Sequence, residues 1–214
     1  MGTLPRAGKV NDAEEFVFGC GTHRFGSDWR VLLSAARTAW GCPMQDLTRA
    51  AEAGSAVAED DFSPAEDIER IDVERLEQAK SSVDIAMYAF TDRYIADEVK
   101  RLAERGVKIR IYRDQEQYED EQKKASKKED DSTTSMLTGL ASVQIRVKGH
   151  RELMHLKAYV IDGTVLRDGS ANWSPSGEKR QDNNAHFTAD PAQVSAFRRD
   201  FEEMWSRTDN LVVQ

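Results

Sequence analysis

The sequence predicts an α/β fold: a mixed, largely parallel β-sheet flanked by helices, preceded by an N-terminal helical extension. Residues 83–90 have the pattern of a strand, 92–104 of a helix and 107–112 of a second strand. Such a strand-helix-strand unit normally joins parallel strands by a right-handed crossover. Further strand patterns cover 142–148, 155–162, 164–166 and 183–188, and an amphipathic helix pattern covers 191–207.

The N-terminal part differs in character from the rest. Residues 1–55 are predicted to form a helical extension of unknown role, with an apolar helix face over 28–40, and the main domain is predicted over 56–214. We expect the extension to pack on the main domain; a partner-binding arm is the alternative. Ser63-Pro64, followed by acidic residues, predicts that a helix opens the main domain.

Residues 115–135 are almost wholly polar, so we expect a solvated, mobile loop or a frayed helix there. The alternative is that its lysines, from Lys123 to Lys128, guide a polyanion towards the main domain. The acidic residues around these lysines weaken that alternative.

Composition excludes some classes of protein. With 214 residues, 39% of them hydrophobic, the chain is long enough to bury one sizeable core. A net charge of -8 argues against non-specific coating of nucleic acid. Cys20 and Cys42 are interpreted as free thiols, since neither belongs to a zinc-binding pattern, and no metal or cofactor is expected. No apolar run is long enough to cross a bilayer, so a cytoplasmic protein is expected, although a removed export signal would be invisible.

One stretch has a spacing that indicates chemistry. His155 and Lys157 alternate with apolar residues, so on a strand they project from the same face. A neutral imidazole can attack phosphorus or move a proton near neutral pH, and an adjacent ammonium favours a bound phosphate. Asp162 follows at the strand end, and Ser170 and Asn172 come after a glycine, with a hydroxyl and an amide suited to phosphoryl oxygens.

These residues resemble the signature of the phospholipase D superfamily, which is His-x-Lys, four residues, Asp, six residues, Gly-Ser-x-Asn. A weaker resemblance to single-motif members extends the similarity to roughly residues 60–206. The resemblance implies a metal-independent phosphodiesterase in which one histidine forms a phosphohistidine and a second, from another motif copy, protonates the leaving oxygen. This chain has one copy. We therefore expect a homodimer, with His155 of one subunit as nucleophile and His155 of the other as general acid and then base.

The remaining motif residues receive roles on the same basis. Lys157 and Asn172 are expected to hold the phosphoryl oxygens, and Ser170 to add a hydrogen bond. Asp162 is expected to be structural, fixing the turn or a nearby backbone donor.

Four cations outside the motif are candidate substrate contacts. Lys179 and Arg180 follow the motif, and Arg146 and Lys148 share one face of a predicted strand. For Arg146 and Lys148 the wall of a phosphodiester groove and the solvent side of an ordinary sheet remain equal alternatives.

One departure from the family pattern bears on activity. Bacterial single-motif nucleases carry a glutamate that orients the histidine, and the spacing places Asn183 there. An amide cannot stabilise imidazolium as a carboxylate does, so lowered or absent activity is the expectation unless Asp182 or another acid substitutes. The single-motif form resembles bacterial nucleases and also mitochondrial cardiolipin hydrolase or Zucchini-type proteins. Nucleic acid, either DNA or RNA, is therefore the first substrate hypothesis, a phospholipid head group the second, and a weak or inactive binding or assembly module the third.

Overall fold

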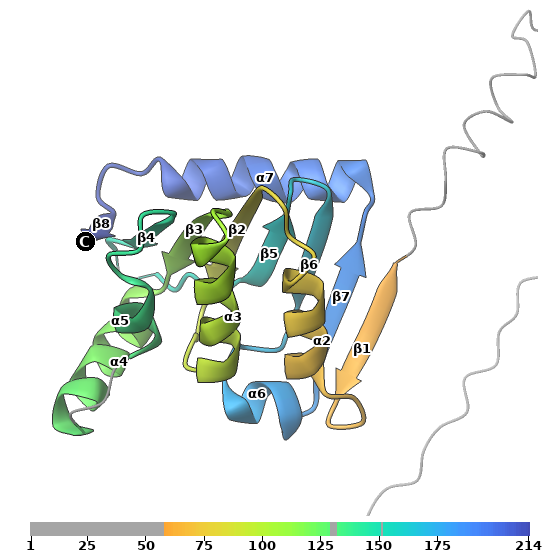
Figure 1. Cartoon of the computed structure of the whole chain (residues 1–214), viewed down its shortest axis with the longest axis horizontal. Helices are drawn as coiled ribbons and strands as arrows, with labels where there is room; N and C mark the ends of the chain where they lie inside the picture. Colours follow the sequence, from red (N-terminus) through yellow and green to blue (C-terminus); the bar gives the residue numbers. More distant parts are fainter. Residues whose placement is uncertain (1–57, 129–131, 151) are drawn as a thin grey trace, which may run out of the picture. The chain divides into compact units, whose positions relative to one another are not determined.

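The computed structural model describes residues 58–128, 132–150 and 152–214 (Figure 1). The expectations for the N-terminal extension 1–55, including Cys20 and Cys42, lie outside the described residues. The start of the main domain at residue 56 lies outside them as well.

The described residues form one eight-stranded sheet in the order β1-β7-β6-β5-β2-β3-β4-β8. Within it β3 pairs in parallel with β2 and with β4, and the five other pairings are antiparallel. A mixed sheet flanked by helices is confirmed, but "largely parallel" is wrong, because the strand-helix-strand pattern covers only the centre. The strands are β1 (Glu59–Ser63), β2 (Ser82–Met87), β3 (Lys108–Arg113), β4 (Val143–Val147), β5 (Lys157–Ile161), β6 (Val165–Gly169), β7 (Asn183–Thr188) and β8 (Leu211–Val213).

Helices cover both faces of this sheet (Figure 1). Helices α2 and α3 contribute to the larger apolar cluster on one face, and α7 closes the other. Helices α4 and α6 lie at the lower edge of the sheet in Figure 1. The helices are α2 (Ile68–Leu76), α3 (Arg93–Glu104), α4 (Gln115–Lys128), α5 (Thr133–Leu137), α6 (Pro175–Lys179) and α7 (Pro191–Trp205).

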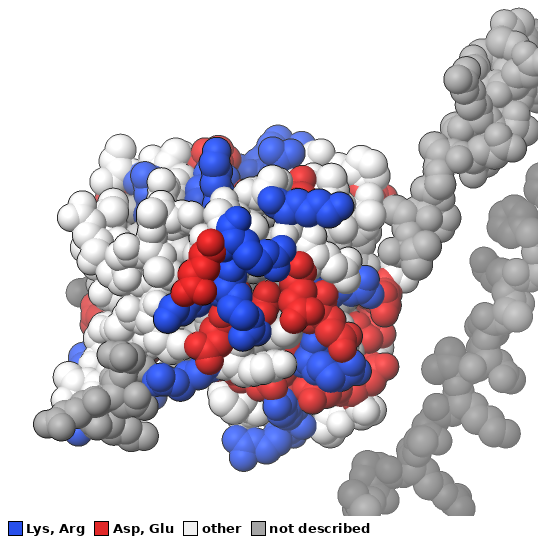
Figure 2. Space-filling model, in the orientation of Figure 1, with Lys and Arg blue, Asp and Glu red and all other residues white. Residues whose placement is uncertain are grey.

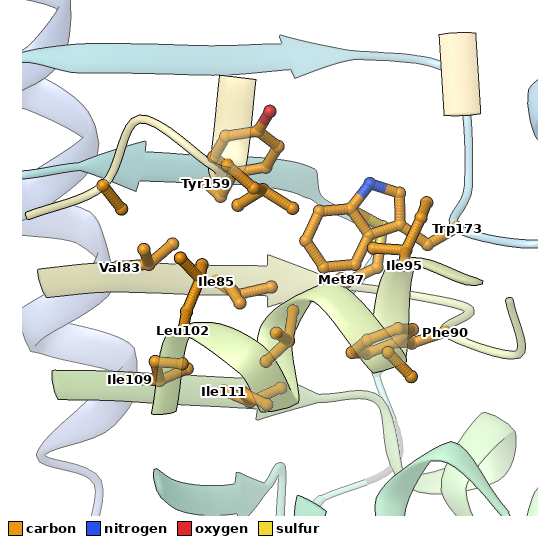
Figure 3. Packing of buried hydrophobic residues seen from close by; sticks show 14 of the residues in the cluster. Val83, Ile85, Met87, Phe90, Ile95, Leu102, Ile109, Ile111, Tyr159 and Trp173 are labelled. Carbon is orange, nitrogen blue, oxygen red and sulfur yellow. The ribbon is translucent and has the colours of Figure 1, made fainter. Parts of the chain in front are cut away.

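The core follows the alternation of the central strands. Val83, Ile85 and Met87 are fully buried in the cluster with α3, and Figure 3 shows them beside Ile95 and Leu102. Each such side chain contributes roughly 1.5–3 kcal/mol by leaving water. This packing holds β2 and β3 rigidly, and the candidate site lies where these strands end.

Two edge strands and the first helix differ from expectation. Neither β1 nor β8 was predicted, because β1 (EDDFS) has a single apolar residue and β8 has only three residues. Ser63 ends β1 instead of opening a helix, and α2 begins at Ile68. The Asp67 side chain caps α2 by accepting a hydrogen bond of 3.2 Å from the Arg70 N–H.

The polar stretch after β3 is a regular helix, α4, where a mobile loop or frayed helix was expected. Its inward face is polar: the buried Glu121 carboxylate accepts from Arg113 Nη2 at 2.7 Å. Glu121 also accepts from the Thr133 hydroxyl at 2.8 Å and the Thr134 N–H at 3.1 Å. Searches for apolar periodicity miss such a face, because a buried ion pair with satisfied hydrogen bonds takes the place of apolar side chains.

Replacing Glu121 by Ala is expected to lower the free energy of unfolding by about 3–5 kcal/mol, because the buried Arg113 guanidinium loses its counter-ion. Urea unfolding measures the loss. The control is Glu119→Ala on the exposed side of the same helix, with an expected change within about 0.5 kcal/mol. Equal losses in the two variants would contradict the anchoring role of Glu121.

Candidate active site

The candidate site lies at the carboxyl ends of β2 and β3, where β5 begins. Tyr88 follows β2, Asp114 follows β3, and Lys157 is the first residue of the antiparallel β5. Two backbone contacts tie the His155 segment to this edge: the Tyr88 N–H donates to Leu156 O at 2.8 Å, and the Met154 N–H donates to the Asp114 carboxylate at 2.9 Å. Ligands of open α/β sheets commonly bind at such an edge.

His155 lies just before β5 and is exposed. Its ring meets the Tyr88 ring edge to face, with centroids 4.6 Å apart. The Tyr88 hydroxyl accepts a hydrogen bond of 3.2 Å from the Gln117 side chain on α4. Tyr88 therefore orients the imidazole while leaving it open to solvent.

Lys157 is 6% exposed, and its ammonium lies within the same group of side chains. Its Nζ donates to His155 O at 2.7 Å and lies 4.9 Å from the centroid of the Tyr88 ring. Burial lowers the pKa of Lys157. Among its contacts in the described part of the chain there is no carboxylate. A partly desolvated ammonium without a counter-ion attracts an incoming phosphate strongly.

Asn172 approaches the site from the other half of the motif. Its Oδ1 accepts from the Ala89 N–H at 3.3 Å, next to Tyr88. Trp173 O accepts from the Thr91 N–H at 2.7 Å, which fixes the same segment to the end of β2. At Gly177 a Cβ atom would lie 2.7 Å from Asn172 O, so glycine permits this close approach.

Ser170 is clamped to β7. Its N–H donates to the Asn184 side-chain oxygen at 3.1 Å, and its Oγ accepts from the Asn184 N–H at 3.0 Å. The hydroxyl proton can still be donated. Gly169 has φ 142°, and a Cβ there would lie 2.4 Å from Asn184 O, so this approach requires glycine.

Asp162 lies at the opposite end of β5 from Lys157. Its carboxylate accepts from the backbone N–H groups of Lys80, Ser81 and Ser82 at 2.8–3.0 Å, and from the Ser81 hydroxyl at 2.7 Å. These hydrogen bonds outweigh partial burial and lower its pKa to about 2. Asp162 thus joins the end of β5 to the start of β2, and these contacts support the structural role expected for it.

The four candidate substrate cations differ in their surroundings. Lys179 pairs with Glu69 of α2, which raises the pKa of Lys179, and Arg180 is exposed after α6. Arg146 stacks on the Trp205 ring, 4.6 Å from its centroid, and donates to Trp205 O. These contacts favour packing against α7 over substrate binding for Arg146.

Lys148 is also drawn into the structure. It is 7% exposed, and its Nζ donates to Leu153 O at 3.3 Å. Lys148 therefore supports the segment that leads to His155, and the groove wall considered for it stays a prediction. Arg151, close to this segment in the sequence, lies outside the described residues.

Asn183 faces the turn before β7. Its Nδ2 donates to Gly177 O at 3.0 Å and to Gln181 Oε1 at 3.3 Å. Within the described part of one subunit no contact joins Asn183 to His155. Nor do the described residues include a group of three or more His, Cys, Asp or Glu side chains that could hold a metal ion.

Sequence reasoning missed Tyr88, Gln117 and Arg167 at or beneath this site. Tyr88 was interpreted as part of a buried strand, and Gln117 falls in the polar stretch. The Arg167 guanidinium is fully buried and donates to the carbonyl oxygens of Lys157 and Ala171. The available signal for Arg167 was a cation directly after the apolar residues Val165 and Leu166.

An exposed imidazole, a desolvated ammonium and an amide at one sheet edge define a site suited to phosphate-ester chemistry. The family model "Cardiolipin synthase, PLD-like domain" matches residues 73–205. The chain therefore belongs to the phospholipase D superfamily.

Two curated relatives carry the name mitochondrial cardiolipin hydrolase. The Drosophila melanogaster protein is 32% identical over 165 residues, which cover 66% of this chain and 61% of the relative. The Chlamydomonas reinhardtii protein is 29% identical, with 61% of this chain and 54% of the relative covered. The chain thus spans less than two thirds of the length of either protein.

Two solved structures share the fold. Nuc from Salmonella typhimurium, a phospholipase D family member, has a TM-score of 0.61 at 17% identity and covers 74% of this chain and 98% of its own. NucT from Helicobacter pylori has a TM-score of 0.62 at 24% identity, with 72% and 99% covered.

Replacing Asp162 by Asn tests its charge, since Asn also tolerates the left-handed backbone at φ 52°. With a folded pKa of about 2 against 3.8, Asp162 stabilises the fold above pH 4 and loses this contribution as the pH falls towards 2. The variant should be about 1–2 kcal/mol less stable at pH 7, after allowance for solvent screening. Its stability should also fall less between pH 4 and 2. Parallel acid unfolding curves for both proteins would refute this role.

Proposed function

We propose that the chain is a metal-independent phosphodiesterase that cleaves nucleic acid through a phosphohistidine formed at His155. The observation that carries the proposal is the exposed His155 ring beside the buried ammonium of Lys157. Among the described residues, no carboxylate contacts this ammonium. An imidazole nitrogen attacks phosphorus and the bond to the leaving oxygen breaks. Lys157 and Asn172 hold the phosphoryl oxygens, and Ser170 donates a hydrogen bond.

The general acid comes from another copy of the chain. The sequence has one His-x-Lys motif, so in the proposed homodimer the partner's His155 protonates the leaving oxygen. It then takes a proton from the water that hydrolyses the phosphohistidine. Leu153 and Leu156 flank His155 and are 49% and 37% exposed. These apolar side chains are suited to burial against a second copy.

The polar cavity next to the site weighs against a lipid substrate. The cavity beside the Met154–Asp114 contact measures about 390 Å³ and is lined by Asp114, Gln115, Glu116, Glu119 and His150. Such walls do not suit acyl chains, and their three carboxylates repel phosphates as well, so the cavity weighs against a lipid without marking where a nucleic acid binds. On the face over α2 and α3, basic and acidic side chains interleave, so binding is proposed at the site rather than over a broad basic surface (Figure 2).

A phospholipid head group is the second candidate substrate, because the curated relatives are named cardiolipin hydrolases. Leu153 and Leu156 would then contact acyl chains. A non-catalytic binding or assembly module is the third candidate, supported by the amide at Asn183. No described helix is both long and apolar enough to cross a membrane. A cytoplasmic location stays a prediction.

Cleavage of labelled single-stranded DNA, double-stranded DNA and RNA in excess chelator tests the proposal, with cardiolipin vesicles in parallel. We expect cutting of nucleic acid, and at least about 1,000-fold less for His155→Ala because the nucleophile is lost.

The matched control is His186→Ala. In the wild type, His186 Nδ1 lies 2.8 Å from Asp60 Oδ1, between β7 and β1. The His186→Ala variant should cut at nearly the wild-type rate. Turnover of cardiolipin alone would replace the first substrate with the second. Binding of nucleic acid without turnover of any substrate would favour the third candidate.

A further inference from the structure

A group of polar side chains lies in the core directly beneath the candidate site. It consists of Asp72 on α2, Tyr159 on β5, Arg167 on β6, Trp173, and Glu178 on α6, all of them fully buried. We call it the Asp72–Arg167 cluster. A buried charge is costly unless it is paired and hydrogen-bonded, so a cluster of this kind needs a physical reason.

The Arg167 guanidinium spans a gap that the sheet leaves open. The ladder between β5 and β6 runs from Ile161↔Val165 to Tyr159↔Arg167 and ends there. Beyond that point Arg167 Nη1 donates to Lys157 O at 2.8 Å and to Ala171 O at 3.2 Å. The Arg167 side chain thus takes the place of ladder hydrogen bonds between the two motif segments. In one segment it binds the carbonyl group of Lys157, and in the other that of Ala171, which lies between Ser170 and Asn172.

The Asp72 carboxylate fixes the same two segments a second time. Its Oδ1 accepts from the Tyr159 hydroxyl at 2.9 Å, two residues after Lys157. Its Oδ2 accepts from the Trp173 indole N–H at 2.8 Å, one residue after Asn172. Figure 3 shows that the Tyr159 hydroxyl and the Trp173 nitrogen point in the same direction. The same carboxylate forms an ion pair with Arg167, whose Nη2 lies 3.1 Å from Oδ2 without hydrogen-bond geometry.

Glu178 completes the charge balance of the cluster. Burial, and then the nearby Asp72 carboxylate, raise the pKa of Glu178 to about 9. Neither of its carboxyl oxygens has a hydrogen-bond partner among the described residues, and Oε1 lies 3.9 Å from Arg167 Nη2. At neutral pH Glu178 is therefore protonated, which leaves one cation and one anion in the cluster.

We propose that the Asp72–Arg167 pair positions Lys157 and Asn172 relative to each other, and so sets the spacing of the phosphate-binding groups. Both are positioning residues, because they act through the Lys157 and Asn172 segments and do not touch the substrate. The proposal rests on the proposed function in needing a phosphodiester at this site, and it is independent of which phosphodiester that is.

The test uses Arg167→Lys, which keeps the charge but cannot reach both carbonyl groups and Asp72 with one ammonium. The substrate is bis(4-nitrophenyl) phosphate, a small diester without a nucleic-acid or lipid part. Because a displacement of about 1 Å can slow a reaction about 100-fold, we expect kcat to fall about 100-fold while KM stays within about twofold.

The control for general loss of stability is Leu102→Ala. Leu102 lies on α3 and is fully buried, so this substitution leaves a cavity in the core. Both variants are assayed at a temperature at which circular dichroism shows them folded. An unchanged kcat in Arg167→Lys, or an equal fall in Leu102→Ala, would overturn the positioning role.

Binding of orthovanadate, measured by calorimetry, separates this proposal from the proposed function. We expect the wild type to bind it and Arg167→Lys to bind it about tenfold more weakly. If the wild type binds vanadate but cuts no nucleic acid, the proposed substrate fails and the two affinities still decide the positioning role. Equal affinities would overturn that role, and no binding by the wild type would overturn both proposals.

Glu178→Gln tests the charge state of the cluster. The folded pKa of about 9 exceeds the ordinary 4.5, so Glu178 stabilises the fold fully below pH 4.5 and loses this contribution as the pH rises towards 9. The wild type should therefore release about one more proton than the variant on unfolding at pH 7, and melting scans from pH 5 to 9 should fall less steeply for the variant. Identical slopes would show that Glu178 is ionised in the fold. The charged groups that act on it are Asp72, Arg167, Asp92 and Glu69.

Discussion

The Arg167 guanidinium supplies hydrogen bonds at the point where the sheet stops pairing and the site begins. Strands β5 and β6 pair as far as Tyr159↔Arg167, and beyond that point their chains separate. This separation lets Lys157 and Asn172 meet the end of β2 from two directions, but it leaves carbonyl groups without ladder partners. An unpaired buried carbonyl is costly, and Arg167 supplies the missing donors.

The local electrostatics of the site follow from the same arrangement. Lys157 is buried against a carbonyl oxygen and the Tyr88 ring, so its ammonium is desolvated without being neutralised. The Arg167 charge is balanced nearby by Asp72 while Glu178 remains protonated. Within the motif, the ammonium of Lys157 is therefore available to a phosphate, in a setting where an ion pair is stronger than in water.

Much of this fold could be predicted from the sequence, because the central strands and α3 carry clear periodicity and capping signals. The bounds of β7 were predicted as they are found, and Asp92 caps α3 as its position before the helix suggests. Short edge strands and the polar face of α4 escaped prediction, because neither depends on an apolar repeat. The edge strands β1 and β8 depend on pairing with strands distant in sequence, and α4 depends on the ion pair between Glu121 and Arg113.

The candidate site, too, could be predicted only in part. The strand period of two predicted that His155 and Lys157 share one face, but β5 begins at Lys157, so His155 lies outside the strand and its ring packs on Tyr88. Tyr88 and Arg167 could not be assigned, because their roles depend on which segments the fold brings next to them. For Arg146 the groove wall and the ordinary sheet face could not be separated, because the sequence does not reveal that Trp205 lies over the guanidinium.

The most direct measurement is the mass of the peptide that contains His155 after a reaction with a short labelled oligonucleotide has been stopped in alkaline denaturant, which preserves phosphohistidine. The covalent mechanism predicts that this peptide gains the mass of a nucleotide fragment, and that the adduct decays as product appears. Cleavage with no adduct at His155, or with an adduct on another residue, would contradict it.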